Sequence, residues 1–232
     1  MKPTRIAVLA SGSGSTAEAF IRTVHQQNYP LDVVLVIANN PDAFVLERVK
    51  NLNNEYNLHI SSAVINSRTQ RNAAPIVPGQ QTDEEQAAIL KLLDDHSVDL
   101  VLLLGYMKRV GPKLLAVFGW MPNYTSIYQC RMLNTHPGLL PDTVGTHGRD
   151  TQAFTLAQNM KEGGQSLHAV SDEYDTGPTV AEHRVPVEPG DSADTLFDRV
   201  QAVEKSHIAA DVAAFVQAQQ HYQKEAHKWQ LS

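Results

Sequence analysis

An amide and an imidazole that could act together on an acyl group lie in the segment MLNTHPGLLP, residues 132–141. Asn134 and His136 are separated by one residue, so in an extended strand both side chains project to the same face, roughly 6.5 to 7 Å apart at the backbone. An amide N–H beside an imidazole that exchanges a proton suits the binding of an oxyanion. Pro137 has a fixed φ and no N–H, which predicts that the strand ends there. Taken alone, a histidine at a strand end is more often a hydrogen-bonded structural residue than a catalyst.

A second polar segment, SDEYDTGP (171–178), places three carboxylates in one turn: Asp172, Glu173 and Asp175. One interpretation is a solvated acidic turn, with an Asx-turn at Asp175 before a glycine and a proline. The other is that one carboxylate reaches the imidazole of His136. A neighbouring carboxylate favours the imidazolium and raises its pKa, which would suit a general acid near neutral pH.

A glycine-rich turn, SGSGS (11–15), lies between an apolar run and an amphipathic segment. Backbone N–H groups in such a turn approach a phosphate closely, and the start of the following helix adds about half a positive charge. The third glycine of a dinucleotide fingerprint and the Lys-Ser/Thr pair of a P-loop are both missing. Two interpretations stay open: a monophosphate cradle, or a tight turn in which Ser15 or Thr16 caps the helix.

The ten histidines of the sequence show no metal-binding spacing. His136, His147, His168 and His183 lie in separate segments, without a His-x-x-Glu-His or cysteine-rich pattern. Acid–base chemistry without a metal is therefore favoured. We expect the single cysteine, Cys130, to be a buried or incidental thiol.

Alternating apolar and amphipathic segments predict how these residues are positioned. Expected strands are 5–10, 31–39, 58–65, 98–106 and the run RMLNTHP, and expected helices are 16–27, 42–56, 83–96 and 151–163. The alternation predicts a Rossmann-like α/β fold: a doubly wound, mostly parallel sheet with helices on both faces, which binds ligands at the carboxyl ends of its strands. Residues 165–187 predict an antiparallel hairpin, and Asp191 or Ser192 is expected to cap a long C-terminal helix.

Length and composition predict one soluble globular domain. The chain has 232 residues, 42% of them hydrophobic and 19% charged, and no repeat or linker divides it. We expect a single domain, 1–232, with a nucleotide-phosphate-binding half of about 1–115 and a catalytic half of about 116–232. A net charge of −6 without a basic stripe excludes nucleic acid as a general partner. We expect a cytoplasmic protein, because the sequence has a single cysteine and no signal-peptide pattern. We expect no membrane span, because no run of about 18 apolar residues occurs.

Five motifs occur together and in order: SGSGST, LLLGYMKRV, NTHPGLLP, SLHAVSDEYDTGP and VPVEPGDSADTLFDRVQAVE. Over residues 5 to about 215 this set resembles the folate-dependent formyltransferases, most closely the branch that acts on glycinamide ribonucleotide in purine biosynthesis. The resemblance implies transfer of a formyl group from 10-formyltetrahydrofolate, as co-substrate, to the amine of glycinamide ribonucleotide. It implies small-molecule substrates and no metal, and it leaves a homodimer open.

The resemblance also assigns residues. Asn134, His136 and Asp175 fall on the family's catalytic triad: the first two would stabilise the tetrahedral oxyanion, and Asp175 would hold and charge the imidazole. The positions that match the phosphate-binding turn and the other substrate contacts are Gly12, Gly14, Ser15, Thr16, Gln201 and Glu204. The positions that match the folate pocket are Arg68, Met107, Lys108, Arg109, Val110, Asn134, Ser171, Asp172, Glu173, Tyr174 and Asp175.

The chain departs from the family pattern at three positions. Gly138 replaces the serine of Asn-x-His-Pro-Ser, Thr16 stands where an asparagine is usual, and Arg109 stands where an apolar residue is usual. The segments 66–82, expected to be a long loop, and 119–130 look longer than is typical. These differences leave the triad intact and bear on the choice of formyl acceptor.

Other functions stay open at this point. The triad could formylate another amine, such as that of an amino sugar nucleotide, or hydrolyse formyltetrahydrofolate. The SGSGS turn alone suggests a dinucleotide-binding oxidoreductase, which predicts an acidic residue at the end of the second strand, where Asn39 and Asn40 occur instead. A non-catalytic binding module would be unaffected by loss of Asn134 and His136.

Overall fold

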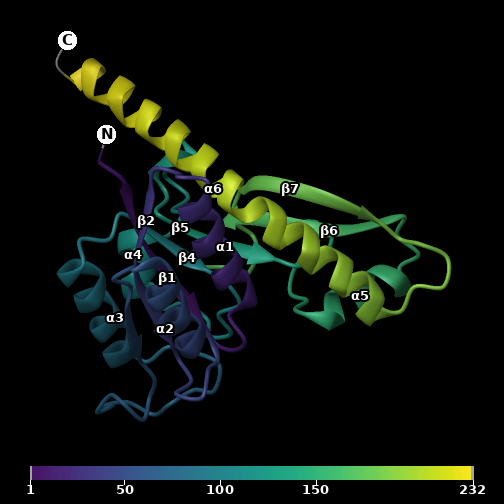
Figure 1. The fold of residues 1–232 in the computed structure, drawn as a ribbon, viewed down its shortest axis with the longest axis horizontal. Helices are drawn as coiled ribbons and strands as arrows, with labels where there is room; N and C mark the ends of the chain where they lie inside the picture. Colours follow the sequence, from purple (N-terminus) through teal and green to yellow (C-terminus); the bar gives the residue numbers. More distant parts are fainter. Residues whose placement is uncertain (1, 231–232) are drawn as a thin grey trace.

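One sheet organises the chain. The structure, a computed structural model, describes residues 2–230, and within this range the chain forms a seven-stranded sheet of order β3-β2-β1-β4-β5-β6-β7 (Figure 1). The strands are β1 (Thr4–Ala10), β2 (Leu31–Ala38), β3 (Ser61–Val64), β4 (Leu100–Leu103), β5 (Met132–His136), β6 (Glu162–Ala169) and β7 (Thr179–Pro186). The strands β1 to β5 pair in parallel, whereas β6 and β7 pair antiparallel with their neighbours. The predicted parallel sheet and its antiparallel hairpin are thus confirmed.

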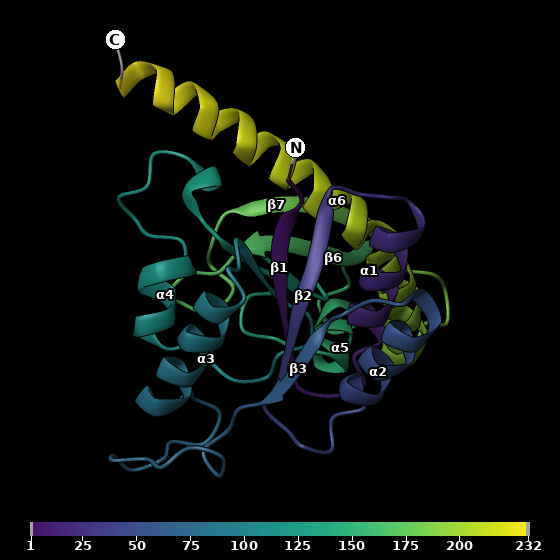
Figure 2. The same cartoon turned by 60° about the vertical axis from the view of Figure 1, so that its left-hand side comes forward.

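Helices cover both faces of this sheet, as the alternation predicted. They are α1 (Ser15–Gln26), α2 (Val45–Tyr56), α3 (Asp83–Asp95), α4 (Pro112–Phe118), α5 (Arg149–Ala157) and α6 (Ala193–Gln230), with a short 3-10 turn at Ile127–Gln129. Figure 2 shows α3 and α4 on one side of the sheet and α1 and α2 on the other. The helix α6 packs along α1, β6 and β7 and extends beyond the sheet toward the C-terminus (Figure 1).

Alternate residues of the central strand β1 contribute side chains to two separate hydrophobic cores, one on each face of the sheet. Ile6 and Val8 pack with the helices α1, α2 and α6, whereas Ala7 and Leu9 pack with α3 and α4. All four are fully buried. Because successive side chains of a strand point to opposite faces, a strand covered on both sides reads as a continuous apolar run.

One boundary error concerns the segment after α5. Residues 158–163 were expected to continue the helix, but α5 ends at Ala157, and β6 begins at Glu162. Asn159 adopts a left-handed φ of 53° and reverses the chain. Gly164 then lies so close to β7 that a Cβ there would be 2.4 Å from the carbonyl oxygen of His183. Strand pairing with a neighbour distant in sequence therefore overrides the local helical pattern.

The starts of the helices differ in how they are capped. Ser192 accepts a hydrogen bond from the backbone N–H of Thr195 (3.2 Å), which confirms it as the cap of α6. At α1 the interpretation in which Ser15 or Thr16 caps the helix is wrong, because Gly14 occupies the cap position and no side chain bonds there. The N–H groups of the first turn of α1 are therefore left without an intrahelical acceptor.

No helix among residues 2–230 combines the length and the apolar character that crossing a bilayer requires.

Candidate active site

The SGSGS turn carries the chain from the carboxyl end of β1 into α1. Gly14 has a left-handed φ of 67°, and a Cβ at this position would lie 2.4 Å from the Cβ of Val45 and 2.8 Å from its Cα. The backbone of the turn is also fixed, because the N–H of Val45 donates to the carbonyl of Gly12. The start of α2 therefore packs directly against the turn, which only glycine permits. The turn presents the uncapped N-terminus of α1, a site suited to an anion.

Arg48 of α2 braces the same turn. Its Nε donates to the carbonyl oxygen of Ser13 (2.8 Å), and its Nη1 pairs with the carboxylate of Glu18. The hydroxyl of Ser11 accepts a hydrogen bond from the backbone N–H of Met107 (2.7 Å) and so ties the turn to the loop after β4. These side chains hold the glycine-rich turn without blocking its N–H groups.

The end of β5 places Asn134 and His136 on one face, as the strand period predicted. His168 lies directly opposite Asn134 on β6, and its Nδ1 donates to the carbonyl oxygen of Ala169 (3.0 Å). In the neutral ring Nε2 is then the acceptor, and the amide Nδ2 of Asn134 donates to it at 3.0 Å. His168 therefore fixes which way the amide of Asn134 points and leaves its second N–H for a ligand.

Asp175 completes the cluster from the loop between β6 and β7. It has a left-handed φ of 57°, and only it is buried among the three acidic residues of that turn, whereas Asp172 and Glu173 are exposed. Its Oδ2 lies 3.4 Å from Nδ1 of His136, and its Oδ1 lies 3.5 Å from Nε2 of His168. One carboxylate thus reaches both imidazoles, at distances longer than a well-formed hydrogen bond.

Burial shifts the ionisation of this cluster toward neutral groups. Burial, and then the charge of His168, lowers the pKa of His136 to about 4, while burial lowers the pKa of His168 to about 4. Burial raises the pKa of Asp175 to about 6, against the backbone N–H of Gly145 and the charge of His147. The expectation that a carboxylate raises the pKa of His136 is therefore wrong for the free protein, because burial of the imidazole is the largest contribution and lowers that pKa.

Both ring nitrogens of His136 face protein groups. While Nδ1 faces Asp175, Nε2 lies 2.9 Å from the hydroxyl of Thr143. Within the described residues, Oδ2 of Asp175 is buried and has no hydrogen-bond partner. A proton between Oδ2 and Nδ1 would satisfy both atoms.

The buried carboxylate of Glu204 on α6 faces the same edge of the sheet. Burial raises its pKa, and hydrogen bonds with Thr135 and Thr16, together with the charge of Lys205, oppose that rise. Thr135 alternates with the catalytic candidates on β5, so it points to the opposite side of the strand. Glu204 therefore links α6 to the end of β5 and to the first turn of α1.

A cavity of about 200 Å³ joins these parts at the carboxyl ends of β1, β4 and β5. It contains all six predicted substrate contacts and the whole predicted triad, together with Met107 and Tyr174. The lining residues that the sequence predicted are Gly12, Gly14, Ser15, Thr16, Met107, Asn134, His136, Tyr174, Asp175, Gln201 and Glu204. The structure therefore brings the predicted phosphate-binding turn and the predicted catalytic triad to one site.

A second cavity, of about 30 Å³, adjoins the first where the loop after β4 meets residues 171–175. Its lining includes the predicted folate residues Lys108, Arg109, Val110, Asn134, Ser171, Asp172, Glu173, Tyr174 and Asp175. Arg109 crosses it and donates to the carbonyl oxygen of Asp172 (2.8 Å). The backbone N–H and carbonyl of Arg109 bond to Gly79 and Gln81 of the long loop.

Other predicted residues lie outside these cavities or play no part in them. Arg68 is exposed in the long loop and lines neither cavity, so its role as a folate contact stays a prediction. Cys130 is fully buried, and burial raises the pKa of its thiol to about 11, which fits a structural thiol. In the described part of the chain, no three histidine, cysteine or acidic side chains group as metal ligands.

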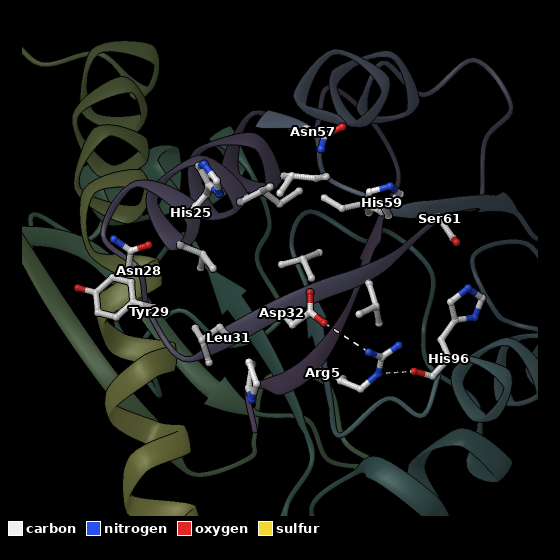
Figure 3. Close-up of a pocket in the computed structure, with 17 residues that line it drawn as sticks. Arg5, His25, Asn28, Tyr29, Leu31, Asp32, Asn57, His59, Ser61 and His96 are labelled. Carbon is white, nitrogen blue, oxygen red and sulfur yellow. Dashed lines mark hydrogen bonds and ion pairs between the residues drawn. The ribbon is translucent and has the colours of Figure 1, made fainter. Parts of the chain in front are cut away.

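A further cavity, of about 580 Å³, lies at the opposite edge of the sheet (Figure 3). It is bordered by the amino ends of β1 and β2 and by the carboxyl ends of α1, α2 and α3. Arg5 pairs there with Asp32 at 3.4 Å and donates from Nε to the carbonyl oxygen of His96. No residue of the predicted site lines this cavity.

Three residues of the site were not identified from the sequence as contributing to it. His168 was considered only as a metal ligand, although its place seven residues before Asp175 on a predicted strand was a usable signal. Thr143 and Arg48 carry no local signal, because their roles depend on contacts with His136 and Ser13 that appear only in the folded chain.

Comparison with known proteins agrees with this geometry. A protein-family model described as formyl transferase matches residues 4–212. Phosphoribosylglycinamide formyltransferase of Escherichia coli (strain K12) is 34% identical over 199 residues, which cover 86% of this chain and 81% of that protein. The Mycobacterium tuberculosis protein of the same name (strain H37Rv) is 32% identical over 212 residues, which cover 91% of this chain and 85% of that protein.

Solved structures give the same result. The crystal structure of phosphoribosylglycinamide formyltransferase from Bacillus halodurans matches with a TM-score of 0.74 at 32% identity, covering 92% of this chain and 95% of that one. The Brucella melitensis protein of the same name matches with a TM-score of 0.76 at 29% identity, covering 92% and 96%. Sequence, fold and site agree, and the chain belongs to the formyl transferase family.

Proposed function

We propose that this enzyme transfers the formyl group of 10-formyltetrahydrofolate to the amine of glycinamide ribonucleotide. The observation that carries the proposal is the shared cavity, which sets the uncapped N-terminus of α1 beside the cluster of Asn134, His136 and Asp175. A nucleotide phosphate at the helix and an amine at the cluster would together fill this site. The relatives named phosphoribosylglycinamide formyltransferase support this acceptor over an amino sugar nucleotide. They also support formyl transfer over the function of a dinucleotide-binding oxidoreductase.

The phosphate would bind at Gly14, Ser15 and Thr16, where the N–H groups of the first turn of α1 and the helix dipole favour an anion. The net charge of −6 makes such a local cradle necessary, because the protein surface does not attract anions in general. Glu204 and Gln201 would accept hydrogen bonds from the ribosylglycinamide part of the substrate. The backbone of Lys108 and Val110 and residues 171–175 would bind the pteridine ring of the folate.

A cavity of about 30 Å³ holds roughly one water molecule, so the pteridine ring needs side chains to move. The contact of Arg109 with the backbone of Asp172 bridges the two walls and is half exposed, with 49% of the arginine side chain accessible. Met107 and Tyr174 are 55% and 48% exposed, and they offer apolar surface to the folate. Separation of the two walls would open the pocket between these residues.

In the reaction, the amine nitrogen attacks the formyl carbon, and a C–N bond forms as the carbonyl oxygen takes up negative charge. The free N–H of Asn134, whose orientation His168 fixes, and the protonated ring of His136 would stabilise that oxyanion. The bond from the formyl carbon to the folate N10 then breaks, and the proton lost by the amine passes to N10 through a water, because both ring nitrogens of His136 face protein groups. The products are the formylated amine and tetrahydrofolate.

The experiment follows tetrahydrofolate formation from 10-formyltetrahydrofolate with and without glycinamide ribonucleotide. We expect turnover that depends on the ribonucleotide and saturates with it. Equal turnover in its absence would replace transfer with hydrolysis of the folate. Turnover with an amino sugar nucleotide, and none with glycinamide ribonucleotide, would keep the chemistry but change the acceptor.

A further inference from the structure

The hydroxyl of Thr143 lies between the imidazole of His136 and a backbone carbonyl. Its Oγ1 is 2.9 Å from Nε2 of His136 and 3.0 Å from the carbonyl oxygen of Leu139. Thr143 is only 1% exposed, so bulk water does not compete for these contacts. A hydroxyl has one hydrogen to donate and lone pairs to accept, so it can donate to either neighbour and accept from Nε2.

This arrangement fits both charge states of the ring. With Nε2 unprotonated, the hydroxyl of Thr143 donates to it. With Nε2 protonated, the ring donates to Oγ1 and the hydroxyl hydrogen turns to the carbonyl of Leu139. That carbonyl also accepts the backbone N–H of Thr143 at 3.2 Å, so it has a partner in either state. His136 can therefore gain a proton without leaving a buried polar atom unpaired.

Gly138 provides the space for this contact. A Cβ at position 138 would lie 2.2 Å from Oγ1 of Thr143 and 2.9 Å from Nε2 of His136. The φ of Gly138 is not left-handed, so its conformation does not require glycine. What requires it is the close approach of the Thr143 hydroxyl and of Cγ2 of Thr151, which would lie 2.6 Å from such a Cβ. A serine at this position, as in the family motif, would meet both groups.

We propose that Thr143 is a positioning residue for His136. Its hydroxyl, for which Gly138 leaves space, holds the imidazole ring and stabilises the protonated form of that ring during formyl transfer. The inference rests on the proposed role of His136. It adds a group that touches neither substrate and acts through the imidazole alone. Burial lowers the pKa of His136, and a hydrogen bond with the backbone of Thr143 opposes that shift.

The test compares four variants with the wild-type enzyme. Thr143→Val removes the hydroxyl, and Thr143→Ser keeps it. Gly138→Ala keeps the hydroxyl but crowds it, together with Thr151 and the ring of His136. Thr155→Val is the matched control, because Thr155 is also 1% exposed and its hydroxyl also bonds a carbonyl four residues earlier, at Thr151. Imidazole ¹⁵N shifts are titrated by NMR in the free protein, with His136 identified by its loss in His136→Gln, and steady-state formyl transfer is measured in parallel.

Thr143→Val should lower the pKa of His136 by about one unit and reduce kcat roughly 10- to 100-fold, the loss expected for a hydrogen bond to a charged group. The KM values should change less than about threefold, because Thr143 touches neither substrate. Gly138→Ala should move both readouts in the same direction, whereas Thr143→Ser and Thr155→Val should stay near wild type.

The proposal is overturned if Thr143→Val matches Thr155→Val in both readouts, or if the pKa of His136 rises. Thermal melts identify a variant that fails to fold, and Thr143→Ser and Gly138→Ala then still decide the question. If the wild-type enzyme shows no formyl transfer, the proposed function fails. The titration of His136 in the free protein would still test the contact with Thr143.

Discussion

The two edges of the sheet differ in a way that cavity size does not reveal. The amino edge has the larger cavity, about 580 Å³, against about 200 Å³ at the carboxyl edge. Yet Arg5 and Asp32 at the amino edge are 29% and 48% exposed and pair with each other (Figure 3). At the carboxyl edge, His136 and Asp175 are 3% and 6% exposed, and one oxygen of Asp175 has no partner among the described residues. Buried and incompletely satisfied groups, more than volume, mark the reactive edge.

Chain direction explains the difference. In a parallel sheet, each helix that follows a strand begins at the carboxyl edge and ends at the amino edge. The carboxyl edge therefore receives helix N-termini, which favour anions, and the amino edge receives helix C-termini. The uncapped start of α1 lies at the first edge, and the ends of α1, α2 and α3 border the cavity at the second. A phosphate-bearing substrate is favoured at only one of them.

The sharpest test of this comparison replaces one histidine at each edge of the sheet by alanine. His136→Ala should lower kcat/KM for formyl transfer roughly 10²- to 10⁴-fold, the usual loss for an acid–base group. His59→Ala, at the exposed rim of the larger cavity, should leave kcat/KM within about twofold of wild type. Steady-state kinetics with both substrates measures each effect. A large loss in His59→Ala would show that the amino edge takes part in the reaction.

Backbone conformation gives a second contrast. Gly14 and Asn57 both adopt left-handed φ, 67° and 54°, at the carboxyl and amino edges respectively. Asparagine tolerates this φ, so Gly14→Asn adds mainly the clash with Val45 and should cost about 1 to 3 kcal/mol of unfolding free energy. Asn57→Gly should change stability by under about 1 kcal/mol. Urea unfolding measures both. Equal costs would mean that the packing of α2 on the turn does not require glycine at position 14.

The pH dependence of stability separates the edges a third way. His136 and His168 have pKa values lowered to about 4, so they make the folded state more stable as pH rises from about 4 to 6.5. Asp175 has a pKa raised to about 6, so it makes the folded state less stable as pH rises from about 4 to 6. The two effects oppose each other in the wild-type protein.

Asp175→Asn removes the opposing contribution, so its unfolding free energy should rise with pH more steeply than that of wild type, by about 1 to 3 kcal/mol between pH 4 and 6.5. Denaturant unfolding at a series of pH values measures the slope. Asp32→Asn changes the half-exposed carboxylate of the amino edge and should keep the wild-type slope. A wild-type slope in Asp175→Asn would contradict the inferred burial of a neutral carboxyl group.

The sequence predicted most of the sheet from local pattern, whereas the grouping of Asp175 with Asn134 and His136 was implied by the family resemblance. Asn134 and His136 share a face through the period of a strand, and their place at its end follows from Pro137. The sequence did not predict contacts set by register and close packing. His168 meets Asn134 only through the pairing of β5 with β6, and Thr143 meets His136 only because position 138 has no side chain.

The same limit applied to segment boundaries and to ionisation. Residues 158–163 have a helical pattern, yet pairing with β7 draws Gly163 and Gly164 into a strand. The pKa of His136 was expected to rise beside a carboxylate, but the depth of burial, which no motif encodes, lowers it. Segment type is thus a local property, whereas burial and register belong to the whole fold.

The smallest predicted effect tests two arginines that make the same bonds at opposite edges. Arg48 and Arg5 each donate from Nε to a backbone carbonyl at 2.8 Å, at Ser13 and His96 respectively, and each pairs with a carboxylate. Their side chains are 26% and 29% exposed. Glutamine at either position should therefore cost a similar and small amount of stability, about 1 kcal/mol or less.

Their effects on catalysis should differ, because only Arg48 braces the turn that presents the start of α1. Arg48→Gln should raise the KM for glycinamide ribonucleotide about 2- to 5-fold at unchanged kcat, since a looser turn weakens phosphate binding without altering the acid–base cluster. Arg5→Gln should leave both constants unchanged. If both variants lose stability equally and neither changes KM, the turn does not bind the phosphate, and the functional difference between the edges would then rest on the acid–base cluster alone.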